Sequence, residues 1–485
     1  MKYLREQWRE DKLRWALVVC WLLTVISSFF GSYLLPIELP GIGTWYAFRT
    51  LLPVTAVLYA VCAIRTKTFF WRDSSTLEKW CYVFIASVGV YAVLSVFRAI
   101  DLSFSIGRIL NLLFMLLLLF LALRLCRSRD VRRLTLWACG AMLVVIMLLG
   151  VYEVFCGGLV NTKYDNLQQF NIFFRKGQLP VVFSGNTNDY NAAILLLIAA
   201  AVVSVFSVKK EERSRGMLWY LVFLFAGGYF LAMAGGARLC EIGYFILLAA
   251  AALYAFFSRE KCRWVPIVIL CCFMGVQFIS HSHYIIPQTQ AYVQSLADPD
   301  KPNMSFFDIF RNPDAGNLSD EFVTVDDKTG DKTLNDNGSA GVRVKLLFHA
   351  GKCFLDSKGL GVGVGNTEIL ARDGAVIENS RIWSIHCFLA RIVADCGIFA
   401  LIPLCAIAIL LLKKMLRSMA GAIRRKEGAL VGRCLLLLAA LVNYPIVSTA
   451  PSDAQDIVAM WLFLAILVLY TTELPADPEA RKKNG

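Results

Sequence analysis

Long apolar stretches recur along almost the whole chain, and they constrain its fold more than any other feature. Each runs for about 18 to 25 residues, the length of helix that crosses a hydrocarbon core of roughly 30 Å. Of the 485 residues, 58% are apolar and only 18% are charged, and the mean hydropathy is +0.59. Soluble globular domains are more polar than this. The sequence therefore predicts an all-α polytopic membrane protein.

We interpret about twelve of these stretches as transmembrane helices. They are 15–36, 42–64, 80–97, 104–123, 134–156, 189–208, 217–235, 238–257, 264–280, 387–412, 434–449 and 455–472. The first is treated as a retained span, because its apolar core is longer than the about 7 to 15 residues of a signal peptide. A large external loop then separates spans nine and ten. The sequence thus predicts four parts of the chain. They are transmembrane helices one to nine at 1–280, an external (periplasmic) loop subdomain at 281–385, transmembrane helices ten to twelve at 386–472 and a cytoplasmic tail at 473–485.

The positions of lysine and arginine predict the orientation in the membrane, because short cytoplasmic loops are enriched in both. If the chain starts in the cytoplasm, 31 of the 49 basic residues fall on the cytoplasmic side, in the two termini and five connections between spans. Both termini are then cytoplasmic. The formal net charge of +13 thus reflects membrane topology, and no nucleic acid partner is expected.

Two polar segments, residues 157–188 and 281–385, lie outside the cytoplasm in this topology. The longer has 14 acidic and 10 basic residues, so its surface as a whole does not attract anions. Any anion bound on this face must be held by individual arginines. Residues 341–354 carry apolar side chains at helical spacing, and we expect a helix lying near the membrane surface there.

Four arginines lie in or at the outer ends of spans, where a charge is costly to bury: Arg98, Arg108, Arg238 and Arg391. Each is either kept for a partner or pathway, or extends its side chain to the interface. Arg238 differs from the others because it lies in the short turn AGGARLCE, residues 234–241. Small residues there leave the backbone and the guanidinium approachable, so we favour a binding role for Arg238.

Arg238, Arg343 in the surface helix and His386 at the start of the tenth span are predicted to converge on the external face. Two guanidinium groups suit a lipid-linked phosphate or diphosphate, because guanidinium binds phosphate oxygens bidentately. His386 can take or give a proton near neutrality, or it is an interfacial histidine near a helix start. His281 and His283 have no cysteine or carboxylate at ligand spacing and are interpreted as loop residues. No metal or cofactor is expected.

The glycine-rich run GLGVGVGN, residues 359–366, has some likeness to a nucleotide-binding loop. It lacks the Gly-Lys-Ser/Thr ending, and no strand-helix unit surrounds it. The topology also places it outside the cytoplasm, where ATP is scarce. We interpret this run as a close-packing turn.

Four segments, in this order, resemble the O-antigen ligase and polymerase superfamily. They are FSGNTNDYNAAILLLIAA (183–200), AGGARLCEIGYFILL (234–248), GVRVKLLFHAGKCFLDSKGLGVGVGN (341–366) and SIHCFLARIVADCGIFALI (384–402). They are similar to the family's Gly-Asn-Pro-Asn helix start, its Ser-Arg-Gly turn, its Arg, helix and Gly-x-Gly-x-Gly-Asn pattern, and its His-Asn-x-x-Leu-x-x-x-x-Glu-x-Gly pattern. The departures from these patterns are Thr187, Ala237, Leu239, Cys387 and Asp395. Cys387 replaces an asparagine and leaves no amide beside the histidine.

The resemblance implies a GT-C-like fold and an inverting, metal-independent glycosyltransferase at the outer face of a bacterial inner membrane. The donor would be a glycan linked to undecaprenyl diphosphate, and the protein would also contact membrane lipid. The acceptor would be the lipid A core for a ligase, or a growing polymer on another lipid-linked repeat for a polymerase. Arg238 and Arg343 would hold the diphosphate as the glycosidic bond breaks, and His386 would orient or deprotonate the acceptor hydroxyl.

Alternatives stay open on the sequence. No residue distinguishes a ligase, which would serve lipopolysaccharide, from a polymerase. A transporter or flippase for an anionic or lipid-linked substrate is the other class, and it predicts charged or broken helices in mid-membrane, often in two repeated halves. The chain has no convincing internal repeat, and its conspicuous charges lie at the outer edges of spans. The sequence also leaves open whether Cys353 and Cys387 form a disulfide.

Overall fold

The fold was analysed in a computed structural model of the chain. The structure describes residues 11–39, 43–68, 71–156, 180–184, 186–208, 212–258, 323–325, 332–334, 339–374, 384–450 and 457–475, together with single helical residues between 268 and 275. The predicted external segments 157–188 and 281–385 are therefore described only in part. His281 and His283 lie outside the described residues.

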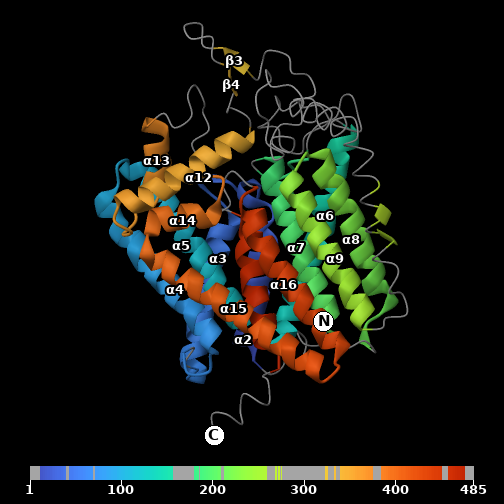
Figure 1. Ribbon diagram of the computed structural model, residues 1–485. Helices are drawn as coiled ribbons and strands as arrows, with labels where there is room; N and C mark the ends of the chain where they lie inside the picture. Colours follow the sequence, from blue (N-terminus) through green and yellow to red (C-terminus); the bar gives the residue numbers. More distant parts are fainter. Residues whose placement is uncertain are drawn as a thin grey trace.

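The described residues are mainly helical (Figure 1). The long helices are α2 (Lys12–Ser28), α3 (Ala47–Thr66), α4 (Thr76–Leu94), α5 (Leu102–Leu125), α6 (Arg129–Cys156), α7 (Thr187–Ser207), α8 (Arg215–Ala234), α9 (Arg238–Phe257), α15 (Ile398–Arg424), α16 (Gly428–Ser448) and α17 (Val458–Thr472). The remaining helices are α12 (Ser339–Asp356), α13 (Asn366–Asp373), α14 (Phe388–Cys396) and the 3-10 helices η1 (Gly31–Tyr33) and η2 (Ser95–Arg98). Two antiparallel hairpins pair β1 (Ile37–Leu39) with β2 (Gly43–Trp45), and β3 (Val323–Val325) with β4 (Lys332–Leu334).

Nine helices in the described part of the chain are long and apolar enough to cross a membrane, and α17 is a shorter apolar helix. The prediction of an all-α polytopic membrane protein is therefore confirmed. Several boundaries agree closely, since the stretch 238–257 is α9 and 104–123 lies within α5. The number of twelve spans stays a prediction, because the stretch 264–280 lies largely outside the described residues.

The tenth predicted span, 387–412, differs from the prediction because it is two helices. α14 ends at Cys396, and α15 begins at Ile398 after a glycine with φ of +60° and ψ of −142°. Only glycine adopts this backbone conformation readily. A Cβ at Gly397 would lie 2.3 Å from the carbonyl oxygen of Gly359, so the break also lets the glycine-rich run approach.

Polar residues at the helix starts explain where several helices begin. Ser75 and Glu78 form a capping box on α4, and Asp11 accepts two backbone N–H groups of α2. Asp101 caps α5 and Asn186 caps α7 in the same way. Such caps satisfy backbone donors that have no partner within the helix.

α17 forms the centre of the bundle. Every residue from 459 to 471 is buried, and this helix packs against α5, α7, α15 and α16. A helix that is apolar all round must be enclosed by other helices, as α17 is. α7 is the second most enclosed long helix and packs against α6, α8, α16 and α17.

α9 and α16 form the most extensive helix pair, and small residues bring them together. A Cβ at Gly432 would lie 2.8 Å from the Tyr254 backbone, and a Cβ at Gly243 would lie 2.7 Å from Asn443 Oδ1. The Asn443 side-chain amide in turn donates to the Gly243 carbonyl oxygen at 3.2 Å. Small residues are typical of helix interfaces within membranes.

α12, α13 and α14 gather at one end of the bundle, which we call the α12 end (Figure 1). The connection between α3 and α4 and the connection between α15 and α16 lie at the opposite end. α7, α9 and α17 begin at the α12 end, and α4 finishes there. This end therefore collects the segments that carry the predicted site residues.

Candidate functional site

The turn between α8 and α9 packs against the first turn of α7. A Cβ at Gly235 would lie 2.3 Å from Thr187 Oγ1 and 2.8 Å from Asn191 Nδ2, so only a glycine permits this approach. Gly236 follows with φ of +62°, and α9 then begins at Arg238. The small residues of the turn thus bring it onto α7 and leave the Arg238 side chain exposed, as the sequence predicts.

Arg343 on α12 is a neighbour of Arg238. Burial lowers the pKa of the Arg343 guanidinium, the Cys240 thiol acts in the opposite direction, and the positive charge of Arg238 lowers the pKa again. Arg343 is half-buried, and its Nε makes no hydrogen bond to a described residue. None of the ion pairs between described residues involves either arginine. Two cations from separate helices therefore lie close together without a carboxylate partner in the described part of the chain.

His386 lies two residues before α14, in a half-buried position with its Nδ1 atom enclosed by protein. The preceding Ile385 is buried in a small apolar cluster with Leu346 and Ala350 of α12. Leu346 follows Arg343 by three residues and so lies on the same face of α12. The segment that carries His386 therefore packs against α12 one turn from Arg343.

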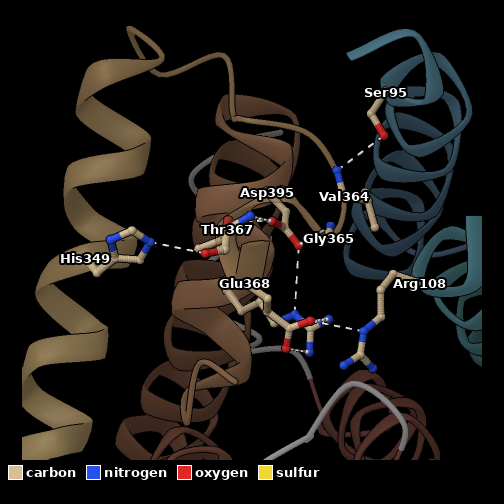
Figure 2. A network of polar contacts seen from close by, with 9 residues as sticks. Ser95, Arg108, His349, Val364, Gly365, Thr367, Glu368 and Asp395 are labelled. Atoms are coloured by element: carbon tan, nitrogen blue, oxygen red, sulfur yellow. Dashed lines mark hydrogen bonds and ion pairs between the residues drawn. The ribbon is translucent and has the colours of Figure 1, made fainter. Parts of the chain in front are cut away.

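A buried polar network lies beside this segment (Figure 2). Glu368 on α13 is fully buried, and its carboxylate oxygens accept from Arg391 at 3.2 Å and pair with Arg108 Nε at 3.0 Å. Arg391 is itself buried and also lies 3.9 Å from Asp395. Buried charges persist when they are paired, and each of these charges lies beside an opposite charge.

Asp395 fixes the glycine-rich run against α14. Its carboxylate accepts from Thr367 Oγ1 at 2.5 Å and from the Gly365 backbone N–H at 3.2 Å (Figure 2). A Cβ at Gly361 would lie 2.4 Å from the Asp395 carbonyl oxygen. Gly359, Gly361, Gly363 and Gly365 all have positive φ. The interpretation of this run as a close-packing turn is confirmed.

The four membrane-associated arginines thus divide into two groups. Arg108 and Arg391 neutralise Glu368, and Arg98 donates to the Gly361 carbonyl oxygen at 3.3 Å. The guanidinium groups of these three arginines therefore contact other residues of the protein. Arg238 is exposed and makes no such contact with a described residue, whereas Arg98, also exposed, has a carbonyl partner.

A cavity of about 320 Å³ opens at the α12 end on another side of α7. The ends of α2, the start of α17 and the turn before α7 surround it. Among the described residues that line it, Asp189 is charged, and serine hydroxyls and aromatic rings lie beside it. Asp189 is 9% exposed and lies in the first turn of α7.

Sequence reasoning missed the acidic residues of this end. Glu368, Asp189 and Glu153 lie in apolar or helical stretches with no local feature that distinguishes them from surface carboxylates. Glu153 lies inside the predicted span 134–156, and a carboxylate within a span is the signal that could have found it. The other two become recognisable only when their distant partners are known.

Two cysteines and a histidine also lie at this end, Cys353 and His349 on α12 and Cys387 just before α14. Cys353 and Cys387 are both free thiols. His349 faces α13, with Nε2 3.1 Å from the Thr367 carbonyl oxygen and 3.4 Å from Cys353 Sγ. This contact ties α12 to α13.

Comparison with known proteins finds a likeness that spans most of the chain. No protein family model matches the sequence. The chain is similar to the teichuronic acid biosynthesis protein TuaE of Bacillus subtilis (strain 168), with 21% identity over 466 residues. The alignment covers 93% of this chain and 82% of that relative. The likeness therefore extends over nearly the whole bundle and is not confined to one motif.

Proposed function

We propose that the protein is a glycosyltransferase of polysaccharide biosynthesis. It would move a glycan from a polyprenyl diphosphate, undecaprenyl diphosphate in bacteria, to an acceptor sugar at the outer face of the inner membrane. The observation that carries the proposal is the pair of neighbouring cations, Arg238 and Arg343, at the α12 end. A relative that by its name serves teichuronic acid biosynthesis supports the polysaccharide class.

The arginine pair suits a diphosphate leaving group. Two like charges held near each other repel, and this repulsion adds to burial in lowering the pKa of Arg343. An anion between the two guanidiniums removes this cost and receives bidentate hydrogen bonds. Negative charge grows on the diphosphate as the glycosidic bond breaks, so the same donors stabilise the transition state more than the ground state.

His386 is proposed as the group that orients or deprotonates the acceptor hydroxyl. General base catalysis contributes about 10² to 10⁴ in rate and needs an imidazole within reach of the attacking oxygen. The attack would come from the face opposite the departing diphosphate, which inverts the anomeric centre. The proton passes to the imidazole and the electron pair of the glycosidic bond to the diphosphate oxygen.

The orientation of the bundle is part of the proposal. The basic connections α3–α4 and α15–α16 lie at the end opposite α12 (Figure 1), which supports an external position for the α12 end under the positive-inside rule. Twelve spans and a GT-C-like arrangement would complete this topology. Both termini would then be cytoplasmic.

A transporter is the competing class, and the break at Gly397 is the feature that it predicts. In transporters, the free ends of broken helices bind ions or substrates. Here the glycine-rich run occupies the break, because Ile398 N–H donates to the Gly359 carbonyl oxygen at 2.8 Å and Gly363 N–H to the Asp395 carbonyl oxygen at 3.0 Å. The break therefore offers packing contacts and no open helix end, which favours the transferase.

The proposal is tested by separate replacement of Arg238, Arg343 and His386 with alanine. Membranes carrying each variant would be supplied with lipid-linked repeat units, and product length would be read from gels. We expect loss of polymer transfer of about 10²-fold or more for each variant. The matched control is Arg372→Ala, an exposed arginine on α13 that pairs with its neighbour Asp373 at 2.8 Å. Full activity of the Arg343→Ala variant in correctly inserted protein would exclude the mechanism.

A deletion strain distinguishes the two acceptor classes. Loss of a ligase leaves long undecaprenyl-linked polymer unattached, whereas loss of a polymerase leaves single repeat units. The same strain, complemented with the Arg238 and His386 variants, tests the site in the living cell.

A further inference from the structure

Three arginines gather at the end of the bundle opposite α12, where α6 and α16 begin and α17 finishes (Figure 1). They are Arg129 and Arg132 in the first turn of α6 and Arg433 in the second turn of α16, and we call them the arginine cluster. Glu473, the residue after α17, is the acidic partner of all three. Its Oε1 lies 2.6 Å from Arg132 Nη2 and 3.6 Å from Arg129 Nε. Its Oε2 lies 3.8 Å from Arg433 Nη2.

The Glu473 carboxylate satisfies one of the three guanidiniums. It accepts a hydrogen bond from Arg132, whose side chain is 6% exposed and whose guanidinium lies 4.6 Å from the centre of the Tyr470 ring. Arg129 and Arg433 are within ion-pair distance of Glu473 but too far for a hydrogen bond. The Arg433 side chain is only 20% exposed, and its Nε is enclosed without a hydrogen bond to any residue that the structure describes. The cluster therefore has N–H donors that lack an acceptor in the described part of the chain.

The position of Glu473 is fixed by the residues that follow it. Leu474 is buried, and the Pro475 carbonyl oxygen accepts from Ser418 Oγ of α15 at 3.0 Å. The carboxylate is thus held beside Arg132 and cannot easily move toward Arg433. Within the described ion pairs, three positive charges share this one negative charge. The cluster therefore keeps a surplus of positive charge and suits a further anion.

Exposed tryptophans indicate that this end of the bundle meets lipid headgroups. Trp71 just before α4, Trp137 on α6 and Trp219 on α8 are 47%, 60% and 70% exposed. Tryptophan side chains concentrate where membrane meets water. Trp219 is the fifth residue of α8 and Arg433 is the sixth residue of α16, and both helices begin at this end. The arginine cluster thus lies at a depth where lipid phosphates are close by.

A phosphate group has the chemistry that the cluster lacks. Its oxygens accept paired hydrogen bonds from guanidinium, and its charge offsets the positive surplus. Basic pockets between membrane-spanning helices bind the headgroups of anionic lipids in this way. We propose that the cluster binds the phosphate of an anionic membrane phospholipid, with Arg433 and Arg129 as donors and Arg132 held in place by Glu473. A free phosphate anion has the same chemistry, so the experiment must separate the two sources.

Thermal stabilisation measures binding at this site without any transferase activity. The full-length protein in detergent would be melted with a thiol-reactive dye, because Cys240 and Cys396 are buried until it unfolds. A ligand that binds only the folded state raises Tm with its concentration. Dioctanoyl phosphatidylglycerol, dioctanoyl phosphatidylcholine and inorganic phosphate would be titrated separately.

We expect a saturable rise in Tm with the anionic phosphatidylglycerol, a smaller rise with inorganic phosphate and none with phosphatidylcholine, whose added cation repels the cluster. An equal rise with both lipids, or none with either, would overturn the proposal. A rise with inorganic phosphate as large as that with phosphatidylglycerol at equal concentration would assign the cluster to a free anion and overturn the lipid as its source.

Three variants locate the binding. Arg433→Gln should raise the phosphatidylglycerol concentration for half-maximal effect by about tenfold or more, because hydrogen bonds to charged groups are strong. Arg129→Gln should raise it by about threefold, and this 84% exposed side chain is not needed for folding. The control Arg65→Gln removes an exposed arginine of the same end, paired with Asp11 at 3.3 Å, and should change it less than about twofold. An effect of Arg433→Gln no larger than that of the control would refute the site.

Glu473→Gln separates a lipid site from a purely structural clamp. If the arginines only join α6, α16 and α17 through this carboxylate, the variant loses stability and gains nothing from lipid. At a phosphate site the carboxylate competes with the ligand, so its neutralisation should lower the half-maximal phosphatidylglycerol concentration by about threefold or more. An unchanged or weaker response would overturn the proposal. Arg238→Ala, at the other end of the bundle, should respond to the lipid as wild type does, so this test is independent of the proposed transferase.

Discussion

Replacement of Glu368 by glutamine is the sharpest test of how the α12 end is held together. The side chain keeps its shape but loses its charge, so Arg391, whose side chain is 2% exposed, loses its ion pair at 3.2 Å and keeps the more distant Asp395 at 3.9 Å. Arg108 loses its partner at 3.0 Å as well. Removing one partner of a buried ion pair costs about 3–5 kcal/mol, because the remaining charge stays buried without compensation.

The expected loss of stability converts to a shift in melting temperature. Unfolding entropy of about 2.1 cal/mol/K per residue gives about 1 kcal/mol/K for a chain of this length, so Glu368→Gln should lower Tm by about 3–5 °C. A thiol-reactive dye measures this in detergent, because Cys240, Cys396 and Cys434 are buried until the protein unfolds.

Two comparisons make the Glu368 prediction refutable. Asp373→Asn removes an exposed carboxylate from the same helix and should shift Tm by less than about 1 °C, because exposed pairs contribute about 0–1 kcal/mol. The double variant with Arg391→Met should lose less than the sum of the two single losses, because each removes the charge that the other leaves buried. Additive losses, or a Glu368→Gln shift no larger than the control, would refute the network as a stabilising unit.

Three further predictions concern residues at the α12 end. Gly361→Ala should destabilise by more than about 1 kcal/mol, because its φ is +83° and the Cβ would lie 2.4 Å from a carbonyl oxygen. Gly351→Ala on α12, where the Cβ meets nothing within 4 Å, should stabilise by about 0.5–1 kcal/mol in the same melting assay. Burial, with the Asp395 and Asp356 charges, raises the pKa of Cys353 to about 11. Its thiolate form, which is the nucleophile, is therefore scarce at neutral pH, and alkylation monitored by mass spectrometry should accelerate up to about pH 11; a plateau near pH 9 would contradict the burial of this thiol.

The helices could be predicted because their signal is local. Long apolar runs identify a membrane helix without knowledge of its neighbours, and α9 begins and ends where the sequence indicates. The break between α14 and α15 could not be predicted in this way, because the apolar run continues through Gly397. What ends α14 is a contact with Gly359, nearly forty residues earlier, which leaves no trace in hydropathy.

The candidate site was predictable to a similar degree. Arg238 stands out from its neighbours as a charge in a small-residue turn, and the structure leaves it exposed as expected. Glu368 and Asp189 had no such local signal. Glu368 is paired with Arg108 of α5 and Arg391 of α14, and Asp189 lines a cavity together with a turn whose backbone N–H groups donate to Glu153. These pairings join residues that are far apart in the sequence, so they can be recognised only in the folded bundle.

The distribution of charge at the α12 end separates the arginines that stabilise the fold from the arginines of the candidate site. The fold pairs Arg108 and Arg391 with one buried carboxylate, although burying three charges costs free energy. These pairs hold the glycine-rich run and α14 in place. The same fold holds Arg238 and Arg343 near each other, and neither has a carboxylate partner among the described residues. This contrast between arginines with and without a described carboxylate partner supports the proposal that Arg238 and Arg343 receive the missing negative charge from a ligand.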